Sequence, residues 1–166
     1  NGESHLHIYP FLKRGTLVSD DSLLYLAIDL DGEELLETEA NELLTALKEL
    51  KTKRLSKLSI HHSMGFSASF LQNILDLADN KAIFWLHDYF SLCPSYNLRR
   101  NDDGYCSAPD IESNACNLCS YIEVRKEQMP IFERLFNKND FQIATPSQFT
   151  YDLWQSRFPV QVEAKV

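Results

Sequence analysis

The chain has 166 residues, of which 44% are hydrophobic and 11% are aromatic. This composition suits one buried core, in a single domain or in one lobe of a larger enzyme. The net charge of -8 provides no basic surface, which argues against binding to nucleic acid. No apolar run approaches the roughly 20 residues of a transmembrane segment, and the polar N-terminal residues lack a signal-peptide pattern. We therefore expect a cytoplasmic protein, or one held peripherally at the membrane in its full-length form.

Apolar residues alternate along the chain between short runs, typical of buried strands, and helical repeats. In chain order the pattern predicts a strand over 5–12, a strand over 23–30, a helix over 36–50, a strand over 55–60, a helix over 70–78, a strand over 82–86, a helix over 121–136, a strand over 141–144, a helix over 146–158 and a strand over 160–166. Pro130 predicts a kink or a break in its helix, because proline removes a backbone hydrogen bond.

This alternation favours the α/β class, as a Rossmann-like parallel sheet with helices on both faces. We expect residues 1–166 to form a single lobe, with a cysteine-containing loop inserted at about 92–120. Three of the predicted strands are followed by residues with reactive or hydrogen-bonding side chains. These are His61 and His62 after 55–60, His87 and Asp88 after 82–86, and Ser147 after 141–144. Ligands of open parallel sheets bind beyond the carboxyl ends of the strands. If the strands are parallel, these side chains share one edge of the sheet, which we call the rim.

The histidines and the aspartate of the rim have a functional and a structural interpretation. Imidazole titrates near neutrality, so His87 suits a hydrogen-bond donor, a general base or a metal ligand. It equally suits a histidine that caps a strand and whose tautomer is set by Asp88. His61 and His62 are neighbours in the chain, and neighbours on a strand point to opposite faces. At most one of the two is therefore expected to enter a cleft.

Two small residues near the rim are also ambiguous. Gly65 permits unusual backbone dihedrals and the close approach of a ligand, although ordinary turns use glycine for the same reason. Ser147 follows a proline at the start of a predicted helix, where a serine commonly caps the helix. A helix N-terminus also favours an anionic group, so capping and ligand binding are compatible.

All four cysteines of the chain lie in the predicted loop, at Cys93, Cys106, Cys116 and Cys119. The last two form a CxxC knuckle, and zinc in closed structural sites prefers four thiolates. A metal would also offset the entropy lost when a long polar loop becomes ordered. The alternatives to structural zinc are disulfides, free buried thiols and an iron–sulfur cluster.

Five short motifs occur in an order and spacing that resemble a known family. They are IHHSMGF, WLHDYFSLCPSYNL, GYC, CNLC and IATPSQFTYDLW, and they lie within residues 55–166. Together they resemble the N-terminal domain of family 4 glycosyltransferases, in the subgroup where a histidine–aspartate pair precedes several cysteines.

The resemblance implies one lobe of the two-lobed GT-B fold. Such enzymes are retaining glycosyltransferases that move a sugar from a nucleotide-sugar donor to a glycan or polysaccharide acceptor. The N-terminal lobe would bind the acceptor, and a C-terminal lobe would bind most of the donor. His87 matches a histidine thought to contact the reacting sugar, with Asp88 beside it, so both are expected to be catalytic. The expected substrate-binding residues are His61, His62, Gly65 and Ser147.

The sequence departs from this family in two respects. It lacks the glycine-rich loop that usually follows the first strand of the lobe, and it stops at Val166, before the donor-binding E-x7-E region. We therefore expect this stretch alone to be inactive and the full-length protein to be the hexosyltransferase-type enzyme. The alternatives are a non-catalytic interaction module with a zinc-stabilised loop on the same scaffold, and a metal-dependent hydrolase that uses His61, His62, His87 and Asp88.

Overall fold

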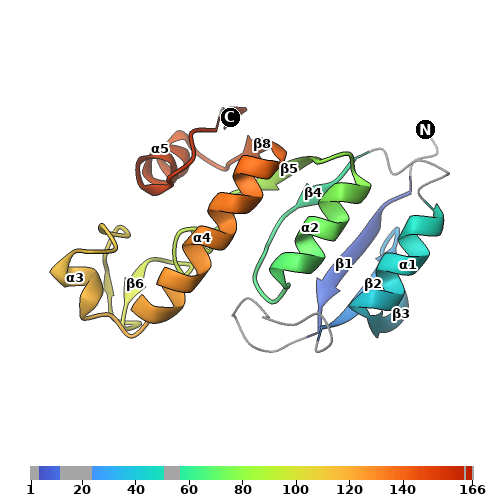
Figure 1. Ribbon diagram of the computed structural model, residues 1–166, viewed down its shortest axis with the longest axis horizontal. Coiled ribbons are helices and arrows are strands. Elements are labelled where there is room, and N and C mark those ends of the chain that lie inside the picture. Colours follow the sequence, from blue (N-terminus) through green and yellow to red (C-terminus); the bar gives the residue numbers. More distant parts are fainter. Residues whose placement is uncertain (1–3, 12–23, 51–56, 163, 166) are drawn as a thin grey trace. The chain divides into compact units, whose positions relative to one another are not determined.

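The computed structural model describes residues 4–11, 24–50, 57–162 and 164–165 (Figure 1). The chain divides into two compact units. The first covers Asn1–Ser56 and Met64–Leu77, and the second covers Lys57–Ser63 and Ala78–Val166. Residues 12, 23, 55, 56, 163 and 166 of the predicted strands lie outside the described residues.

The first unit contains an antiparallel sheet in the order β1-β2-β3, made of β1 (Leu6–Pro10), β2 (Tyr25–Leu30) and β3 (Glu33–Glu39). Asp31 and Gly32 join β2 to β3 with φ angles of 54° and 89°, as in a tight two-residue hairpin turn. The sequence prediction was wrong here, because it placed 23–30 in a parallel sheet and began a helix at 36. The Asp-Gly turn sends the chain straight back beside β2, so 33–39 pair with β2 first.

Two helices complete the first unit, and they pack against each other. Helix α1 (Ala40–Leu50) buries Leu43, Leu44 and Leu47, which have the helical spacing expected from the sequence. Helix α2 (Ala68–Leu77) begins where the Ser67 hydroxyl accepts a hydrogen bond from the Phe70 N–H at 3.0 Å. The alternation of apolar and polar residues therefore located both helices, although α1 is shorter than predicted.

The second unit contains a parallel sheet in the order β4-β5-β8-β9, which confirms the predicted sheet type. Its strands are β4 (Ser59–Ile60), β5 (Lys81–Trp85), β8 (Asp140–Ala144) and β9 (Ala164–Lys165). Ile60 is aligned with Phe84 on β5, and Phe84 is aligned with Ile143 on β8. The carboxyl ends of β4, β5 and β8 consequently lie at the same edge.

An aromatic cluster forms the core of the second unit on one face of this sheet. Phe136, from α4 (Ile122–Lys138), contacts Phe84 and Phe141 of the sheet, with ring centroids 5.1 and 4.5 Å away. Trp154, from α5 (Gln148–Arg157), contacts Phe136 at 5.6 Å. These contacts place α4 and α5 on the same face, so helices on both faces of this sheet stay a prediction.

Helix α4 continues through Pro130 as one element, so the break expected at this residue is not seen. Buried side chains on both sides of the proline anchor the helix. Phe132 lies in the core, and the Gln128 amide donates a hydrogen bond to the Phe90 carbonyl. Because these anchors hold both halves in place, the helix tolerates the hydrogen bond that proline removes.

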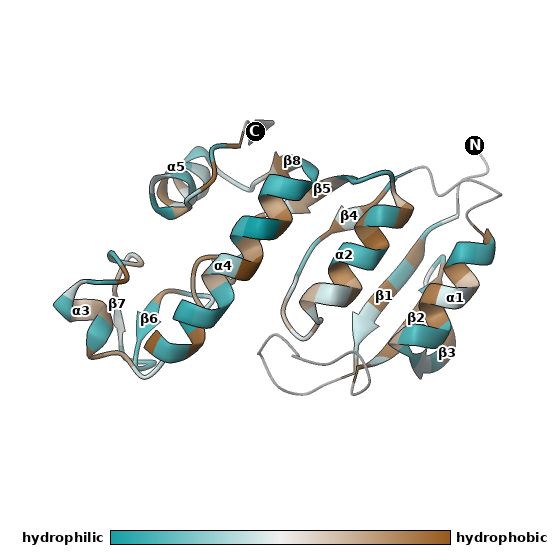
Figure 2. Cartoon of the chain, in the orientation of Figure 1, coloured by the Kyte–Doolittle hydropathy of each residue, from teal (hydrophilic) through white to brown (hydrophobic). Residues whose placement is uncertain are grey.

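The cysteine-containing loop folds back on itself as a small hairpin followed by a short helix. The hairpin pairs β6 (Arg99–Arg100) with β7 (Gly104–Tyr105), and α3 (Asn114–Asn117) follows it. Figure 2 shows that the helices carry both apolar and hydrophilic residues. Within the described parts of the chain, none of the helices has the length and apolarity needed to cross a membrane.

Candidate functional site

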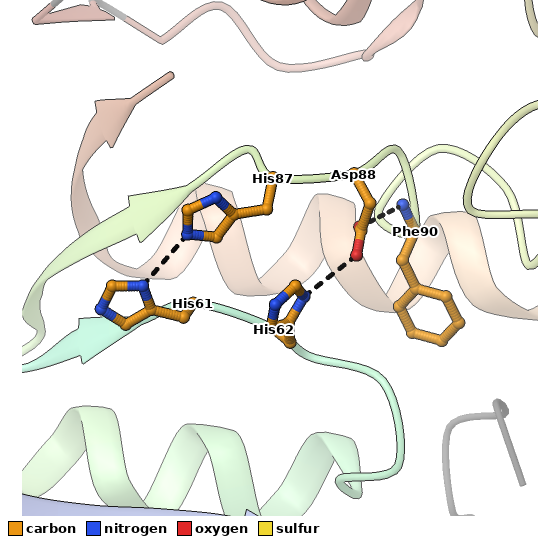
Figure 3. A network of polar contacts seen from close by, with 5 residues as sticks. All are labelled: His61, His62, His87, Asp88 and Phe90. Atoms are coloured by element: carbon orange, nitrogen blue, oxygen red, sulfur yellow. Dashed lines mark hydrogen bonds and ion pairs between the residues drawn. The ribbon is translucent and has the colours of Figure 1, made fainter. Parts of the chain in front are cut away.

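The structure brings together His61 and His87, which the sequence placed at the carboxyl ends of neighbouring strands. His61 directly follows β4, and His87 lies two residues beyond the last residue of β5. The Nδ1 atom of His61 is 3.1 Å from the Nε2 atom of His87, within hydrogen-bonding distance (Figure 3). Both residues are exposed. The prediction that both histidines share one edge of the sheet is therefore confirmed.

A second polar pair lies beside the first. His62 Nδ1 is 3.1 Å from Asp88 Oδ2, and the backbone N–H of Phe90 donates to Asp88 Oδ1 at 2.9 Å (Figure 3). The His62 side chain is 60% exposed, whereas that of Asp88 is 22% exposed. The backbone contact orients the carboxylate, so Asp88 presents its other oxygen to the imidazole.

Trp85 adds an aromatic surface to the histidine pair. Its ring stacks with that of His61 at a centroid distance of 5.3 Å and with that of His87 at 5.4 Å. Trp85 and His87 are two positions apart in the chain, and their rings lie nearly parallel, with an interplanar angle of 4°. The indole Nε1 of Trp85 is buried and has no hydrogen-bond partner among the described residues. Sequence reasoning did not include Trp85, although its spacing from His87 could have identified it.

The hydrogen bonds constrain where the imidazoles carry protons. A carboxylate oxygen only accepts hydrogen bonds, so the Nδ1 atom of His62 carries the proton that is shared with Asp88. Between His61 and His87, one nitrogen must donate and the other must accept. Among the described residues, His87 forms its hydrogen bond through Nε2, which leaves Nδ1 available to a ligand. The rim can thus present an imidazole nitrogen whose donor or acceptor character depends on a neighbouring histidine.

Helix α5 begins shortly after the carboxyl end of β8, which is the third strand whose end was predicted to lie at the rim. Ser147 caps this helix, because its hydroxyl accepts the Thr150 N–H at 3.2 Å. Burial raises the pKa of Tyr89, which lies in the loop after β5. The capping role accounts for Ser147 locally, and its predicted contact with a ligand stays a prediction.

Gly65 belongs to the first unit, whereas the histidines of the rim belong to the second. Its φ angle is +84°, and a Cβ atom there would lie 2.8 Å from Cγ of Pro10. A left-handed backbone together with this close contact explains why glycine occupies the position. Its predicted role in substrate binding stays a prediction.

We expect Gly65→Ala to destabilise the first unit. Strain in the left-handed backbone costs about 1–2 kcal/mol, and overpacking against Pro10 adds about 1–3 kcal/mol. Gly32→Ala is the matched control, since Gly32 has a φ of +89° but no atom within 4 Å of an added Cβ. Urea denaturation followed by circular dichroism gives both values. Equal destabilisation by the two substitutions would show that the contact with Pro10 contributes nothing.

The four cysteines are free, and all four line one pocket in the second unit. Burial raises the pKa of the Cys93 thiol to about 11. The Cys116 sulfur accepts a hydrogen bond from the buried guanidinium of Arg125 at 3.0 Å. Beside the knuckle, the Tyr121 hydroxyl donates to Asp102 at 2.7 Å, and this bond raises the pKa of Tyr121 to about 12.

Side chains that share a pocket or an edge are not necessarily close enough to one another to bind the same metal ion. Across the described ranges, no group of three or more His, Cys, Asp or Glu side chains has the arrangement of a metal site. At the rim, His61 and His87 bond to each other through ring nitrogens. In the loop, the cysteines face the same pocket without converging on one point. Arg125 was not singled out from the sequence, where nothing distinguishes a buried arginine on a helix from an exposed one.

Comparison with models of known protein families, with curated proteins and with solved structures found no significant match. The geometry of the rim and the sequence motifs are therefore the basis for a functional assignment.

The proton assignment at Asp88 predicts a measurable change in Asp88→Asn. The asparagine oxygen can still accept the Phe90 N–H, but its amide group would then face His62 as a donor. We expect His62 to change from a protonated Nδ1 to a protonated Nε2 in the neutral imidazole. Nitrogen-15 chemical shifts of the His62 ring report this directly. An unchanged tautomer in the variant would contradict the hydrogen bond to Asp88.

Proposed function

We propose that this chain is the acceptor-binding lobe of a retaining glycosyltransferase of the GT-B type. In this proposal the full-length protein moves a sugar from a nucleotide-sugar donor to a glycan or polysaccharide acceptor. The observation that carries the proposal is the His61–His87 pair at the carboxyl edge of a parallel sheet, where ligands of such sheets bind. The order of the sequence motifs supports the same assignment.

The polar groups of the rim suit a carbohydrate. Each sugar hydroxyl both donates and accepts hydrogen bonds, and a neutral imidazole offers one donor and one acceptor. His61, His62 and His87 are exposed, so their rings are accessible to a ligand. Asp88 holds His62 in one tautomer, which makes the available nitrogen of His62 an acceptor when the ring is neutral. The rim therefore offers defined acceptors and donors rather than a general charge.

His87 has the central role in this proposal. When the bond between the sugar and the nucleoside diphosphate breaks, positive charge develops at the anomeric carbon and negative charge on the leaving phosphate. A fixed dipole near these charges lowers the barrier, and a hydrogen bond to the sugar also holds it in position. The Nε2 contact with His61 fixes the orientation of the His87 ring. We assign the Nδ1 atom of His87 to the contact with the reacting sugar.

A donor-binding C-terminal lobe in the full-length protein is part of the proposal. The nucleotide would be bound mainly by that lobe, and the N-terminus of α5, capped by Ser147, would face the acceptor side. We place the enzyme in the cytoplasm, where the four free cysteines would remain reduced.

A transfer assay on the full-length protein tests the proposal. The protein is incubated with a panel of uridine, guanosine and thymidine diphosphate sugars and with mixed oligosaccharide acceptors. Release of the nucleoside diphosphate that depends on an acceptor, with a product that keeps the anomeric configuration of the donor, is the expected result. If the protein binds and consumes none of the donors in the panel, the result counts against the proposal.

A further inference from the structure

The pocket that contains the four cysteines is rich in positive charge. Besides the thiols, it is lined by Arg99, Arg100 and Arg125, and none of the described residues that line it is an aspartate or a glutamate. Arg99 donates to the Asp103 carbonyl through two guanidinium nitrogens, and Arg100 is exposed. Arg125 is different, because only 3% of its surface is exposed. The pocket therefore combines four potential thiolates with a buried cation.

The partners of Arg125 leave its charge uncompensated. Its Nε donates to the Leu92 carbonyl at 3.0 Å, and its Nη1 donates to the Pro109 carbonyl at 2.8 Å and to Cys116 Sγ at 3.0 Å. Among the described residues, no carboxylate contacts this guanidinium. A buried charge without a counter-charge is costly, because the charge has left water and gained no opposite charge in return. A negatively charged sulfur in the pocket would remove that cost.

The loop around the pocket also holds backbone conformations that need support. Five non-glycine residues in it have positive φ angles between 46° and 61°, namely Leu98, Asn101, Asp102, Ser107 and Ala108. Such backbone conformations are strained in residues other than glycine and persist only where their surroundings hold them. Asn101 ties the hairpin to the knuckle, since its side chain accepts the Ser120 N–H at 2.7 Å. Cys106 lies within this stretch of tight turns, and the other three cysteines lie on either side of it in the chain.

We propose that Cys93, Cys106, Cys116 and Cys119 bind one zinc ion as four thiolates, with Arg125 as hydrogen-bond donor and counter-charge. Four sulfur–zinc bonds form, four protons are released to solvent, and no oxidation takes place. The product carries a charge of minus two, which the guanidinium partly neutralises. The sulfurs do not converge in the described side-chain conformations. All four already line one pocket, and the proposal requires that their side chains turn toward one another when the metal binds.

Arg125 is a positioning residue in this site. Groups that hydrogen-bond to metal ligands typically change metal affinity about 10–100-fold when they are removed. Arg125→Gln keeps a hydrogen-bond donor but removes the charge, whereas Arg125→Lys keeps the charge on a different geometry. We expect Arg125→Gln to lower zinc affinity by about 10–100-fold and Arg125→Lys to lower it less, as measured by competition with a chromophoric chelator. Equal affinities for all three proteins would overturn the role of Arg125.

The site itself is tested on the full-length protein, purified without added metal and analysed by mass spectrometry for zinc. We expect one zinc ion per chain, and intense sulfur-to-cobalt charge-transfer bands when cobalt(II) replaces it. Cys116→Ser should lose both signals, while Leu118→Ser should keep both. Leu118 lies within the same knuckle and is 76% exposed, so it is the matched control.

Alkylation and mass measurements on the wild-type protein can overturn the proposal, even where a variant fails to fold. Four thiols that are rapidly alkylated in the native metal-free protein, with no protection on adding zinc, would show free cysteines. A mass lower by two hydrogens per bond would show disulfides, and bound iron with inorganic sulfide would show a cluster. None of these readouts uses enzyme activity, so they are independent of the proposed glycosyltransferase function.

Discussion

Replacing His87 with alanine in the full-length protein is expected to lower the rate of sugar transfer by about 10²–10⁴-fold. This is the usual contribution of a positioned side chain that donates or accepts a proton or a hydrogen bond in the transition state. The structural reason is the position of this ring. It lies beyond the carboxyl end of β5, and its Nε2 is 3.1 Å from Nδ1 of His61. The residue is exposed, and the proposal assigns its Nδ1 to the contact with the sugar.

The fold should survive the His87→Ala substitution, because the side chain is exposed and exposed positions contribute little to stability. We expect the loss to appear mainly in kcat, since the contact with the reacting sugar strengthens as charge develops. His7→Ala is the matched control, because His7 is exposed on β1 in the other unit. Near-normal turnover in His87→Ala, with unchanged circular dichroism, would refute the proposed role.

The largest effect on stability is expected for Trp154→Ala, which should lower the free energy of unfolding of the second unit by about 3–5 kcal/mol. Trp154 has no exposed surface, and its ring lies 4.4 Å from that of Phe158. Its indole N–H donates to the Ser91 hydroxyl at 2.8 Å. Removing the ring would leave both a cavity and an unpaired buried hydroxyl, close in sequence to His87 and Asp88 of the rim.

Two further variants separate these contributions to stability. Ser91→Ala removes only the hydrogen-bond acceptor and should cost roughly 1–3 kcal/mol, because the buried indole N–H then lacks a partner. Phe149→Ala, on the same helix but 70% exposed, should change stability very little. Urea denaturation measured by far-ultraviolet circular dichroism compares the three variants. A loss below 1 kcal/mol in Trp154→Ala would mean that the aromatic cluster does not hold the second unit together.

Local patterns in the sequence were sufficient to predict the parallel sheet. The run over 82–86 is rich in aromatic and branched residues, and the polar residues after it marked the carboxyl end of β5. Because strands of one sheet share an edge when they are parallel, placing His61 beside His87 followed from the strand assignment alone.

The hairpin of the first unit shows where periodicity is ambiguous. Leu36 fits a helical repeat with Ala40 and Leu43, but it also pairs with Ile28 across the sheet. Pairing with β2 makes this segment a strand rather than a helix, and the residue pattern within one segment does not show which strand it will pair with. A two-residue Asp-Gly turn such as Asp31-Gly32 indicates a hairpin, which the sequence prediction did not include.

The histidines of the rim were only partly predictable. Alternation along a strand implied that at most one of His61 and His62 would enter a cleft. In the structure His61 lies within hydrogen-bonding distance of His87, and His62 lies within hydrogen-bonding distance of Asp88. Both histidines therefore take part in polar pairs at the same edge. The chain has left the strand at this point, and the strict alternation of side chains no longer applies. Such contacts depend on loop conformation, which residue types alone do not specify.

Titration of the protein with its acceptor is the most direct measurement of whether the rim is the ligand site. The full-length protein, labelled with nitrogen-15 in histidine, receives the oligosaccharide that supports transfer, and the imidazole signals are assigned through single histidine variants. We predict that the rings of His61, His62 and His87 shift on saturation while those of His5 and His7 do not. Saturable binding that leaves the three rim signals unchanged would contradict the account.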